Sequence, residues 1–204
     1  MQKLLIATHN PAKLNEFRSL LSDLPFELLS LADLSIKDEP EEDGKTYSEN
    51  AEKKALFYAK KSNLPALADD GGIEISALKG EPGVKSRRWL GSVASDEELI
   101  AHMRKVAAML PEDNRDARFK LALSLATPFS QVWSVTGEVA GIIAKEPSFR
   151  KIKGYPYRSF FYLPKIHKYY FKNELSLEEM KLYNHRFIAV EKMKQILLST
   201  PQIL

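Results

Sequence analysis

Polar residues of the types that bind phosphate follow the first apolar segment of the chain. The run Lys3–Thr8 has the composition of a buried strand, Asn10 is a favoured N-cap residue, and Pro11 suits the first position of a helix. A helix N-terminus presents free backbone N–H groups and the positive end of the helix dipole, and both attract anions. Lys13 adds a full positive charge one turn into the helix. These residues predict a phosphate site, although such junctions are also common without one and the Gly-x-x-x-x-Gly-Lys pattern of a P-loop is absent.

Two adjacent carboxylates, Asp69 and Asp70, follow the apolar run Pro65–Ala68. Open α/β sheets bind ligands at this end of their strands, and the two glycines that come next let a ligand approach the backbone closely. Since adjacent strand residues point to opposite sides, only one of the two carboxylates should face a ligand. A second interpretation is equally open, because Asp-Gly is a strong turn dipeptide and a turn here would return the chain as a strand over Ile73–Leu78.

An acidic segment, Lys37–Gly44, carries five carboxylates within six residues. Such a segment is typical of a solvated loop, but one carboxylate could also reach a divalent cation, because Mg²⁺ prefers one or two carboxylates together with water and substrate phosphate. Lys53 and Lys54 lie on the helix that a capping box predicts to begin at Thr46. Most lysines of this kind face solvent.

Two pairs of cations have no obvious structural reason for their positions. His185 and Arg186 lie at the expected start of the last helix, where the helix dipole disfavours positive charge. An anionic ligand or a salt bridge to a carboxylate would compensate for that placement. Arg87 and Arg88 follow the turn-forming segment Gly80–Gly83, and either side chain could face a site or solvent.

Helices and strands alternate early in the sequence, and strands follow one another later. We expect helices over Pro11–Leu21, Thr46–Lys61, Ser95–Leu110 and Asn184–Leu198, with a further capping box at Ser176. We expect strands over Lys3–Thr8, Phe26–Leu31, Pro65–Ala68, Ile73–Leu78, Ala117–Ala126 and Val132–Ala144. The pattern predicts an α/β fold over residues 1–204, with a mixed, elongated central sheet, flanking helices and two lobes around an active-site cleft.

The composition excludes several classes of protein. The 204 residues are 44% hydrophobic and 28% charged, and a net charge of +3 is too small for a nucleic-acid coat. Without cysteine there are no disulfides, thiolate metal sites or cysteine nucleophiles. The longest apolar run, Val106–Leu110, is too short to span a membrane, and no secretory leader is present, so we expect a cytoplasmic protein.

Taken together, these motifs resemble those of the inosine/xanthosine triphosphate pyrophosphatases, which remove non-standard purine nucleotides. The family's opening motif, Thr/Ser-x-Asn-x-x-Lys-x-x-Glu, is matched by Thr8, Asn10, Lys13 and Glu16. Its acidic residue before a Thr-[Phe/Tyr]-x-Glu-Asn-Ala helix, and the lysine after that motif, are matched by Glu42, Thr46–Ala51 and Lys54. Further matches, which extend the resemblance over most of the chain, are Ala68–Gly72, Gly80–Trp89, Arg115–Phe119 and Gly137–Gly141.

The resemblance implies hydrolysis of a nucleoside triphosphate to a monophosphate and pyrophosphate, in a homodimer that uses Mg²⁺ or Mn²⁺. Glu42 and Asp70 would hold the metal, Asp70 would also activate water, and Lys13 and Lys54 would neutralise the triphosphate. The substrate would be bound by Thr8, His9, Asn10, Lys13, Gly71, Arg88, Tyr155, Tyr157, Arg158, Met180, His185 and Arg186. Tyr155 or Tyr157 would stack on the base, and His185 and Arg186 would donate hydrogen bonds to it.

The C-terminal third departs from the family pattern. Arg158 stands where the family has aspartate, Met180 where it has lysine, and Asn184 where it has serine. Gly71 also replaces a hydroxyl residue. Because a carboxylate accepts hydrogen bonds and a guanidinium only donates them, the departures imply either an altered base preference or weakened activity.

A different class of function is also open for residues 145–172. This stretch carries eight Lys or Arg and nine aromatic residues, a composition that single-strand nucleic-acid grooves share, so the chain could be a silent relative that binds RNA or a protein. A loop and edge strand, at a dimer interface or elsewhere, is the simpler interpretation. Nucleic-acid binding is the less favoured of the two.

Overall fold

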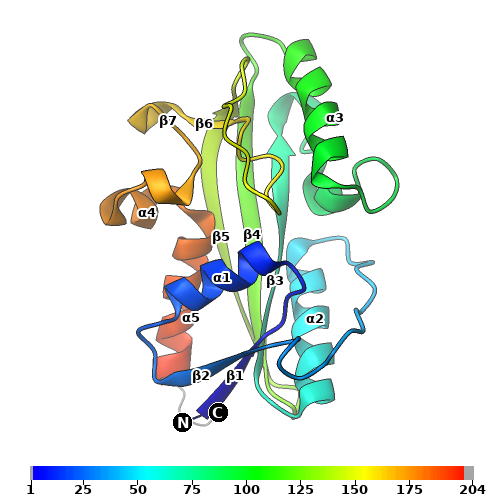
Figure 1. The fold of residues 1–204 in the computed structure, drawn as a ribbon, viewed down its shortest axis with the longest axis vertical. Helices are drawn as coiled ribbons and strands as arrows, with labels where there is room; N and C mark the ends of the chain where they lie inside the picture. The colour runs from blue at the N-terminus through cyan, green and yellow to red at the C-terminus, as the bar shows by residue number, and fades with distance from the viewer. Residues whose placement is uncertain (1, 200–204) are drawn as a thin grey trace. The chain divides into compact units, whose positions relative to one another are not determined.

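The computed structural model describes residues 2–199 and contains a mixed sheet with flanking helices (Figure 1). The strands are β1 (Gln2–Ile6), β2 (Phe26–Ser30), β3 (Ala66–Ile75), β4 (Asp116–Ala126), β5 (Val132–Ile143), β6 (Phe161–Leu163) and β7 (Lys168–Tyr169). The α-helices are α1 (Pro11–Leu20), α2 (Tyr47–Ser62), α3 (Asp96–Met109), α4 (Leu177–Tyr183) and α5 (His185–Ser199). Short 3-10 helices are η1 (Ser76–Leu78), η2 (Gly83–Arg88), η3 (Pro164–Ile166) and η4 (Lys172–Glu174).

The strands pair in the order β2-β1-β3-β4-β5-β6-β7 and form one seven-stranded sheet. Strand β1 is parallel to β2, with Leu4 opposite Leu28, and parallel to β3, with Leu5 opposite Ala66. Strand β6 is antiparallel to both β5 and β7. The predicted α/β fold with a sheet of mixed direction is therefore confirmed.

The chain divides into two compact units. The first contains the residues up to Asp70, residues 121–137 and the residues from Arg186 onward. The second contains residues 71–120 and 138–185. Strands β3, β4 and β5 contribute residues to both units.

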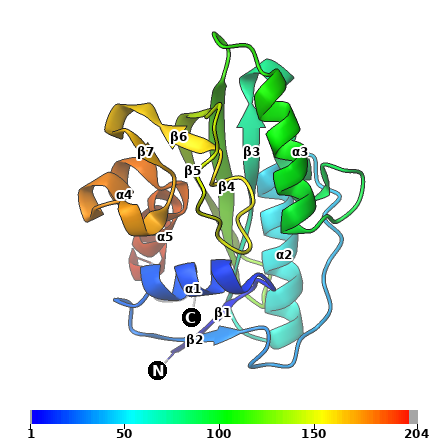
Figure 2. The same cartoon turned by 45° about the horizontal axis from the view of Figure 1, so that its top comes forward.

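In the first unit, alternate residues of β1 and β3 face two different helical layers. Leu4, Ile6 and Leu67 pack with apolar residues of α1 and α5, whereas Leu5 and Ala66 pack with apolar residues of α2. Figure 1 shows α1 and α5 on one side of β1 and α2 on the other, and Figure 2 agrees. The same alternation carries on to the two adjacent aspartates at the end of this part of β3, which therefore point into different layers.

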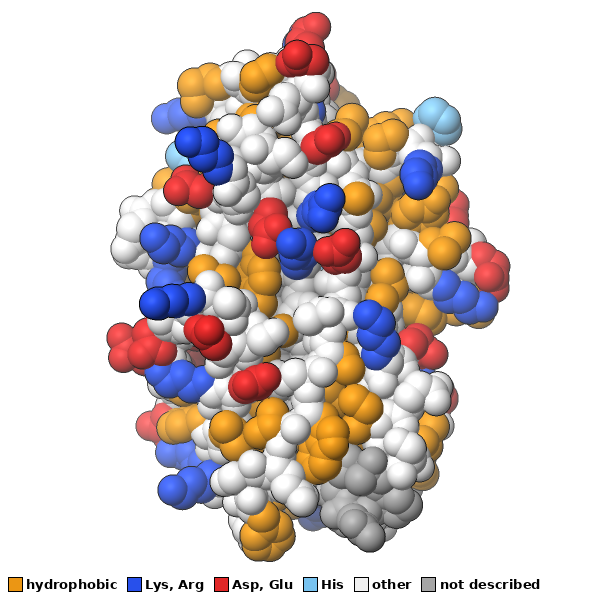
Figure 3. Space-filling view, turned by 180° about the vertical axis from the view of Figure 1, so that it is seen from behind, with side chains coloured by type: hydrophobic (Ala, Val, Ile, Leu, Met, Phe, Trp, Pro, Cys, Tyr) orange, Lys and Arg blue, Asp and Glu red, His pale blue; other side chains and the backbone are white. Residues whose placement is uncertain are grey.

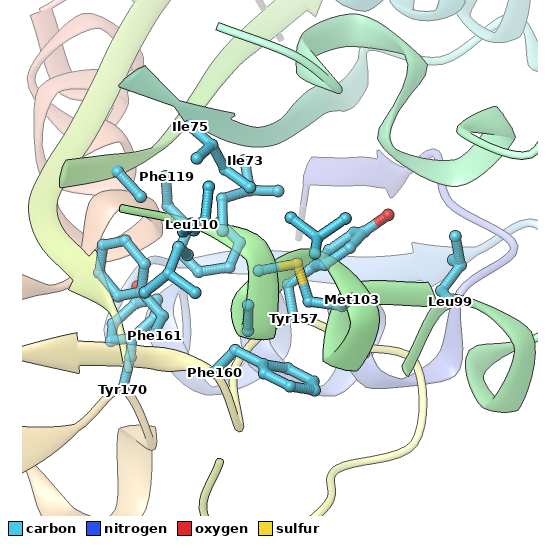
Figure 4. Packing of buried hydrophobic residues seen from close by; sticks show 14 of the residues in the cluster. Ile73, Ile75, Leu99, Met103, Leu110, Phe119, Tyr157, Phe160, Phe161 and Tyr170 are labelled. Carbon is cyan, nitrogen blue, oxygen red and sulfur yellow. The ribbon is translucent and has the colours of Figure 1, made fainter. Parts of the chain in front are cut away.

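The second unit has a core of its own, rich in aromatic rings (Figure 4). The ring centroid of Phe119 lies 4.8 Å from that of Phe161 and 5.4 Å from that of Tyr170. Helix α3 contributes Leu99 and Met103 to the same cluster. This packing fixes β4 and β6 against each other within the unit.

The helix starts follow the sequence signals. Capping boxes at Ser95 and Ser176 are fully formed at the starts of α3 and α4. At α2 the box is half formed, because the Thr46 side chain accepts from the Glu49 N–H while the Glu49 carboxylate accepts from the Lys45 N–H. Helix α5 begins directly after Asn184, as predicted.

The predicted turn at Asp69–Gly72 is wrong, and so is the returning strand over Ile73–Leu78. Strand β3 runs unbroken from Ala66 to Ile75, and residues 76–78 form η1. A tight hairpin of this kind needs positive φ angles, but among the described glycines those with positive φ are Gly80, Gly83, Gly91 and Gly154. The two glycines after the aspartates are instead extended, so the carboxylates lie within a strand and not on a turn.

Residues 145–172 form β6, β7 and the segments around them, so the loop-and-edge-strand interpretation is confirmed. The buried aromatic residues of this stretch are Tyr157, Phe160, Phe161, Tyr170 and Phe171. These five rings cannot serve as stacking platforms for bases, whereas the ring of Phe149 is exposed, so nucleic-acid binding stays the less favoured hypothesis for this stretch. On the face seen in Figure 3, basic and acidic side chains are interspersed. Within residues 2–199, no helix combines the length and the apolar content that crossing a membrane requires.

Candidate active site

The N-terminus of α1 is capped by side chains of the predicted phosphate motif. Asn10 Oδ1 accepts hydrogen bonds from the backbone N–H groups of Ala12 and Lys13, at 2.9 and 3.3 Å. The Asn10 N–H in turn donates to Thr8 Oγ1 at 3.2 Å. The N-cap prediction is confirmed, but the expectation of free backbone donors is wrong, because these N–H groups are already used. An anion at this terminus would have to displace these contacts or be bound by side chains.

Lys13 lies beside the first of the two adjacent aspartates. Its ammonium is 3.2 Å from Asp69 Oδ1 and 3.0 Å from Asp69 Oδ2. Asp69 also accepts from Arg186 Nη2 at 3.1 Å, and Arg186 Nη1 donates to Glu16 Oε2 at 2.8 Å. The salt bridge that was one explanation for Arg186 is therefore present, and its other predicted role, donation to a base, stays a prediction.

The environment of Asp69 favours its charged form. Burial works to raise the pKa of Asp69, but the positive charges of Lys13 and Arg186 outweigh it and hold that pKa well below its usual range. Asp69 is therefore a permanent anion between two cations.

Asp70 points into the other layer, where it meets α2. Asn50 Nδ2 donates to Asp70 Oδ2 at 3.0 Å, and Asn50 Oδ1 accepts from the Gly44 N–H at 2.8 Å. Lys54 Nζ lies 2.8 Å from Glu42 Oε1 and 3.9 Å from Asp70 Oδ1. The structure thus brings together the two predicted metal ligands and one predicted catalytic lysine, and Asn50 ties the acidic segment to Asp70.

Burial dominates the electrostatics of Asp70. It raises the pKa of this carboxyl, against the opposing effects of Lys54 and Lys13. For Lys54, burial works to lower the pKa, but Asp70 and Glu42 raise it on balance. The charged ammonium of Lys54 therefore compensates the negative charge of the Glu42 and Asp70 carboxylates.

The acidic segment is bound to α2 through lysines. Asp43 pairs with Lys53 at 2.6 Å, and Asp38 pairs with Lys61. With the Glu42–Lys54 pair, three carboxylates of this segment are matched to lysines on one helix. The solvated-loop interpretation therefore describes its outer residues, while Glu42 is the carboxylate that reaches Asp70 through Lys54.

His9 lies near the acidic segment, but more loosely. Its Nε2 is 3.7 Å from Glu39 Oε1, and its ring centroid is 6.3 Å from that of Tyr58. The Tyr58 hydroxyl donates to the backbone carbonyl of Asp38 at 3.0 Å, which fixes the start of the segment. His9 itself is exposed, so its predicted contact with substrate stays a prediction.

The oxygen donors of Glu42 and Asp70 suit a hard divalent cation. They already hold one cation, the Lys54 ammonium, between them. Among residues 2–199 no cluster of three or more His, Cys, Asp or Glu side chains could hold a metal. Two carboxylates are nevertheless the usual protein share of a Mg²⁺ site, where water and substrate phosphate supply the other ligands.

The second unit contains Tyr155, Arg158 and His185, which are among the residues predicted to hold a base, whereas Arg186 belongs to the first unit. The Arg158 guanidinium carbon lies 3.7 Å from the ring centroid of Tyr155 and 5.0 Å from that of Tyr170. The Tyr170 hydroxyl is hydrogen bonded to His185 Nδ1 at 2.5 Å, and the His185 ring stacks on Phe119. Arg158, which replaces the family's aspartate, and His185 thus each lie against aromatic rings of the second unit.

Other predicted residues of the second unit have packing contacts. Tyr157 is 5% exposed, and its hydroxyl donates to the Ser86 carbonyl at 2.5 Å, so its ring does not present a free face for stacking. Met180 packs against the core of the unit, Arg88 ends η2 half-buried, and Gly71 lies half-buried within β3.

Comparisons with known proteins identify the family of the chain. The model of the Ham1 family matches residues 4–196. The chain is a member of the Ham1 family. It is 40% identical over 194 residues to a dITP/XTP pyrophosphatase of Geobacter sulfurreducens, covering 95% of this chain and 96% of that protein. It is 36% identical over 197 residues to a dITP/XTP pyrophosphatase of Bacillus subtilis, covering 97% and 98%.

Solved Ham1 structures share the fold over nearly the full length of the chain. A HAM1 protein from Coxiella burnetii superposes with a TM-score of 0.81 at 33% identity, covering 98% of this chain and 100% of that one. The Ham1 protein of Staphylococcus aureus gives a TM-score of 0.78 at 31% identity, covering 97% and 99%. The family resemblance drawn from the motifs is therefore confirmed.

Three polar residues contact the predicted site residues of this Ham1 protein but were not included among them. Asn50 binds Asp70, Asp69 binds Lys13, and Glu16 binds Arg186. Glu16 and Asn50 lie within the motifs that carry the resemblance, which is the one signal that singled them out. Asp69 and Asp70 are residues of the same type, so only the alternation of side chains along β3 distinguishes their roles.

Proposed function

We propose that this Ham1 protein hydrolyses deoxyinosine- and xanthosine-type nucleoside triphosphates to the monophosphate and pyrophosphate, and so removes them from the nucleotide pool. The observation that carries the proposal is the sharing of the Lys54 ammonium by Glu42 and Asp70. The names of the Geobacter and Bacillus relatives supply the substrate class.

Lys13 and Lys54 would neutralise the triphosphate. An ammonium group has three N–H donors, and the contacts of Lys13 with both oxygens of Asp69 leave one for a phosphate oxygen. Thr8 and Asn10 add polar side chains at the end of α1. Positioning and charge neutralisation supply most of the catalysis in phosphoryl transfer, so little covalent chemistry is required of the protein.

Asp70 would orient a water molecule and accept its proton. Burial raises the pKa of this carboxyl toward the range where a general base works well, and Asn50 holds one of its oxygens. The water oxygen would form a bond to the α-phosphorus as the bond to the bridging oxygen breaks, and pyrophosphate would leave. Mg²⁺, with Mn²⁺ as a substitute, would be held by Glu42 and Asp70 and would neutralise charge on the phosphate oxygens.

Arg158 would set the base preference. Its guanidinium is 3.7 Å from the Tyr155 ring centroid and can only donate hydrogen bonds. It would therefore favour the O6 acceptor of an inosine- or xanthosine-type base over the N6 amino group that adenine has at the same position. A homodimer, proposed on the basis of the family resemblance, completes the proposal.

A substrate panel tests the proposal. Pyrophosphate release would be measured with Mg²⁺ for ITP, dITP, XTP and the standard nucleoside triphosphates, with kcat/KM compared across the panel. We expect ITP, dITP and XTP to be hydrolysed well above the standard nucleotides. Release of no pyrophosphate from any of them would contradict the proposal. The mass in solution, measured by light scattering, checks the dimer.

A further inference from the structure

Asp69 is a buried carboxylate to which the proposed reaction gives no part. It is 2% exposed, and the alternation of β3 directs it to the layer of α1 and α5, away from Asp70. A buried charge is costly unless it is paired and hydrogen bonded, so the reason for Asp69 must lie in its partners.

Four charged side chains form a circuit of three contacts that includes Asp69 and begins and ends on α1. Asp69 contacts Lys13 through both oxygens and contacts Arg186 through Oδ2, and Arg186 contacts Glu16. Lys13 and Glu16 are three residues apart on α1 and so lie on one face of that helix. The circuit therefore returns to the helix where it began and joins α1, β3 and α5. Its formal charges, two positive and two negative, sum to zero.

Exposure differs sharply within the circuit. The side chains of Asp69, Arg186 and Glu16 are 1%, 4% and 4% exposed, whereas that of Lys13 is 20% exposed. Asp69, Arg186 and Glu16 are thus buried, and Lys13 is partly exposed to solvent. Stability is a weak reason for such a network, because well-packed apolar residues often serve as well as buried ion pairs. An arrangement of this kind would hold the Lys13 ammonium in a fixed position.

We propose that Asp69 is a positioning residue, which holds the Lys13 ammonium so that its remaining donor faces a polyphosphate. Arg186 and Glu16 keep Asp69 in place. A free lysine side chain loses much rotamer entropy when it binds a ligand, and a pre-oriented one loses less. The inference rests on the proposed function only in taking polyphosphate as the ligand, because the circuit itself lies wholly in the first unit.

A double-mutant cycle tests this inference, with inorganic pyrophosphate as the probe. Its dissociation constant would be measured by titration calorimetry for the parent protein, Asp69→Asn, Lys13→Met and the double variant. We expect Asp69→Asn to weaken binding about tenfold in the parent and to change it little once Lys13 is methionine, since contacting residues are coupled to this extent. Equal effects of Asp69→Asn in both backgrounds would overturn the proposal.

A matched control and a second variant complete the design. Asp33→Asn makes the same change in an exposed Asp33–Arg18 pair and should leave pyrophosphate binding unchanged. If Asp69→Asn does not fold, Asp69→Glu keeps the charge but displaces it, and it should weaken binding in the parent background alone. Failure of the parent protein to bind pyrophosphate would also overturn the inference. Binding without turnover of any nucleotide would instead contradict the proposed function and leave the cycle to decide the role of Asp69.

Discussion

Gly72 lies in β3 two residues after Asp70, at a place where a side chain cannot fit. A Cβ atom at this position would lie 2.2 Å from Ser86 Oγ and 2.5 Å from the carbonyl oxygen of Gly83. Both distances are far below van der Waals contact, so Gly72→Ala must displace Ser86 and the backbone of η2. The substitution therefore tests whether this contact holds β3, the strand that carries the proposed general base Asp70.

The expected loss in the free energy of unfolding follows from the hydrogen bonds that Ser86 makes. Its hydroxyl donates to the Gly83 carbonyl at 2.6 Å and accepts from the Ile73 N–H at 3.1 Å. Overpacking a core costs ~1–3 kcal/mol, and each buried hydrogen bond lost adds ~1 kcal/mol. We expect Gly72→Ala to lower the free energy of unfolding by about 3–5 kcal/mol, if both hydrogen bonds break.

Urea unfolding of four proteins provides the assay. Ser86→Ala alone loses the hydroxyl contacts without a clash and should cost about 1–3 kcal/mol, because the Ile73 N–H is left unpaired. The double variant removes the contact with Ser86 Oγ but keeps the one with the Gly83 carbonyl, so its loss should be smaller than the two single losses together. A loss below about 1 kcal/mol for Gly72→Ala, or strict additivity of the two substitutions, would show that a Cβ atom at Gly72 does not displace Ser86.

Three other predictions concern the site itself. Asn50→Ala removes the hydrogen bonds to Asp70 and to the Gly44 N–H, so it should lower kcat and cost about 2–4 kcal/mol in urea unfolding, whereas an unchanged kcat would contradict a role in holding Asp70. Arg158→Asp exchanges a donor for an acceptor and should shift the ratio of kcat/KM for XTP and ATP, and an unchanged ratio would exclude Arg158 from base selection. Chelation of divalent cations should abolish pyrophosphate release and Mg²⁺ should restore it, whereas full activity in chelator would contradict the metal role of Glu42 and Asp70.

Local signals in the sequence predicted most element boundaries. Each capping side chain accepts a hydrogen bond from a backbone N–H two or three residues later in the sequence, so the caps can be predicted without knowledge of the fold. The capping residues are Asn10, Thr46, Ser95 and Ser176. The turn expected at Asp69–Gly72 failed because Asp-Gly propensity is local, whereas the packing of Gly72 against Ser86 is tertiary and decides the outcome.

The site was predictable in its residue types but not in its pairings. Glu42, Lys54 and Asp70 were expected to act together, and the structure brings them into contact. Arg186 was expected to bind a base or a carboxylate, and its partner Glu16 is 170 residues away in the sequence. Pairings over such separations depend on how α1, β3 and α5 pack, which no local pattern encodes.

We propose Asp70 as the group that activates the attacking water, and this role can be measured by product analysis of Asp70→Asn. The parent protein and the variant would be incubated with XTP and Mg²⁺, and nucleotides and phosphates would be separated by ion-exchange chromatography. We expect the parent to form the monophosphate and pyrophosphate in equal amounts. The variant should keep its fold, as judged by circular dichroism, and lose at least about a hundredfold in kcat. Near-normal turnover by Asp70→Asn would exclude Asp70 as the general base, and release of orthophosphate and a diphosphate by the parent would exclude the proposed reaction.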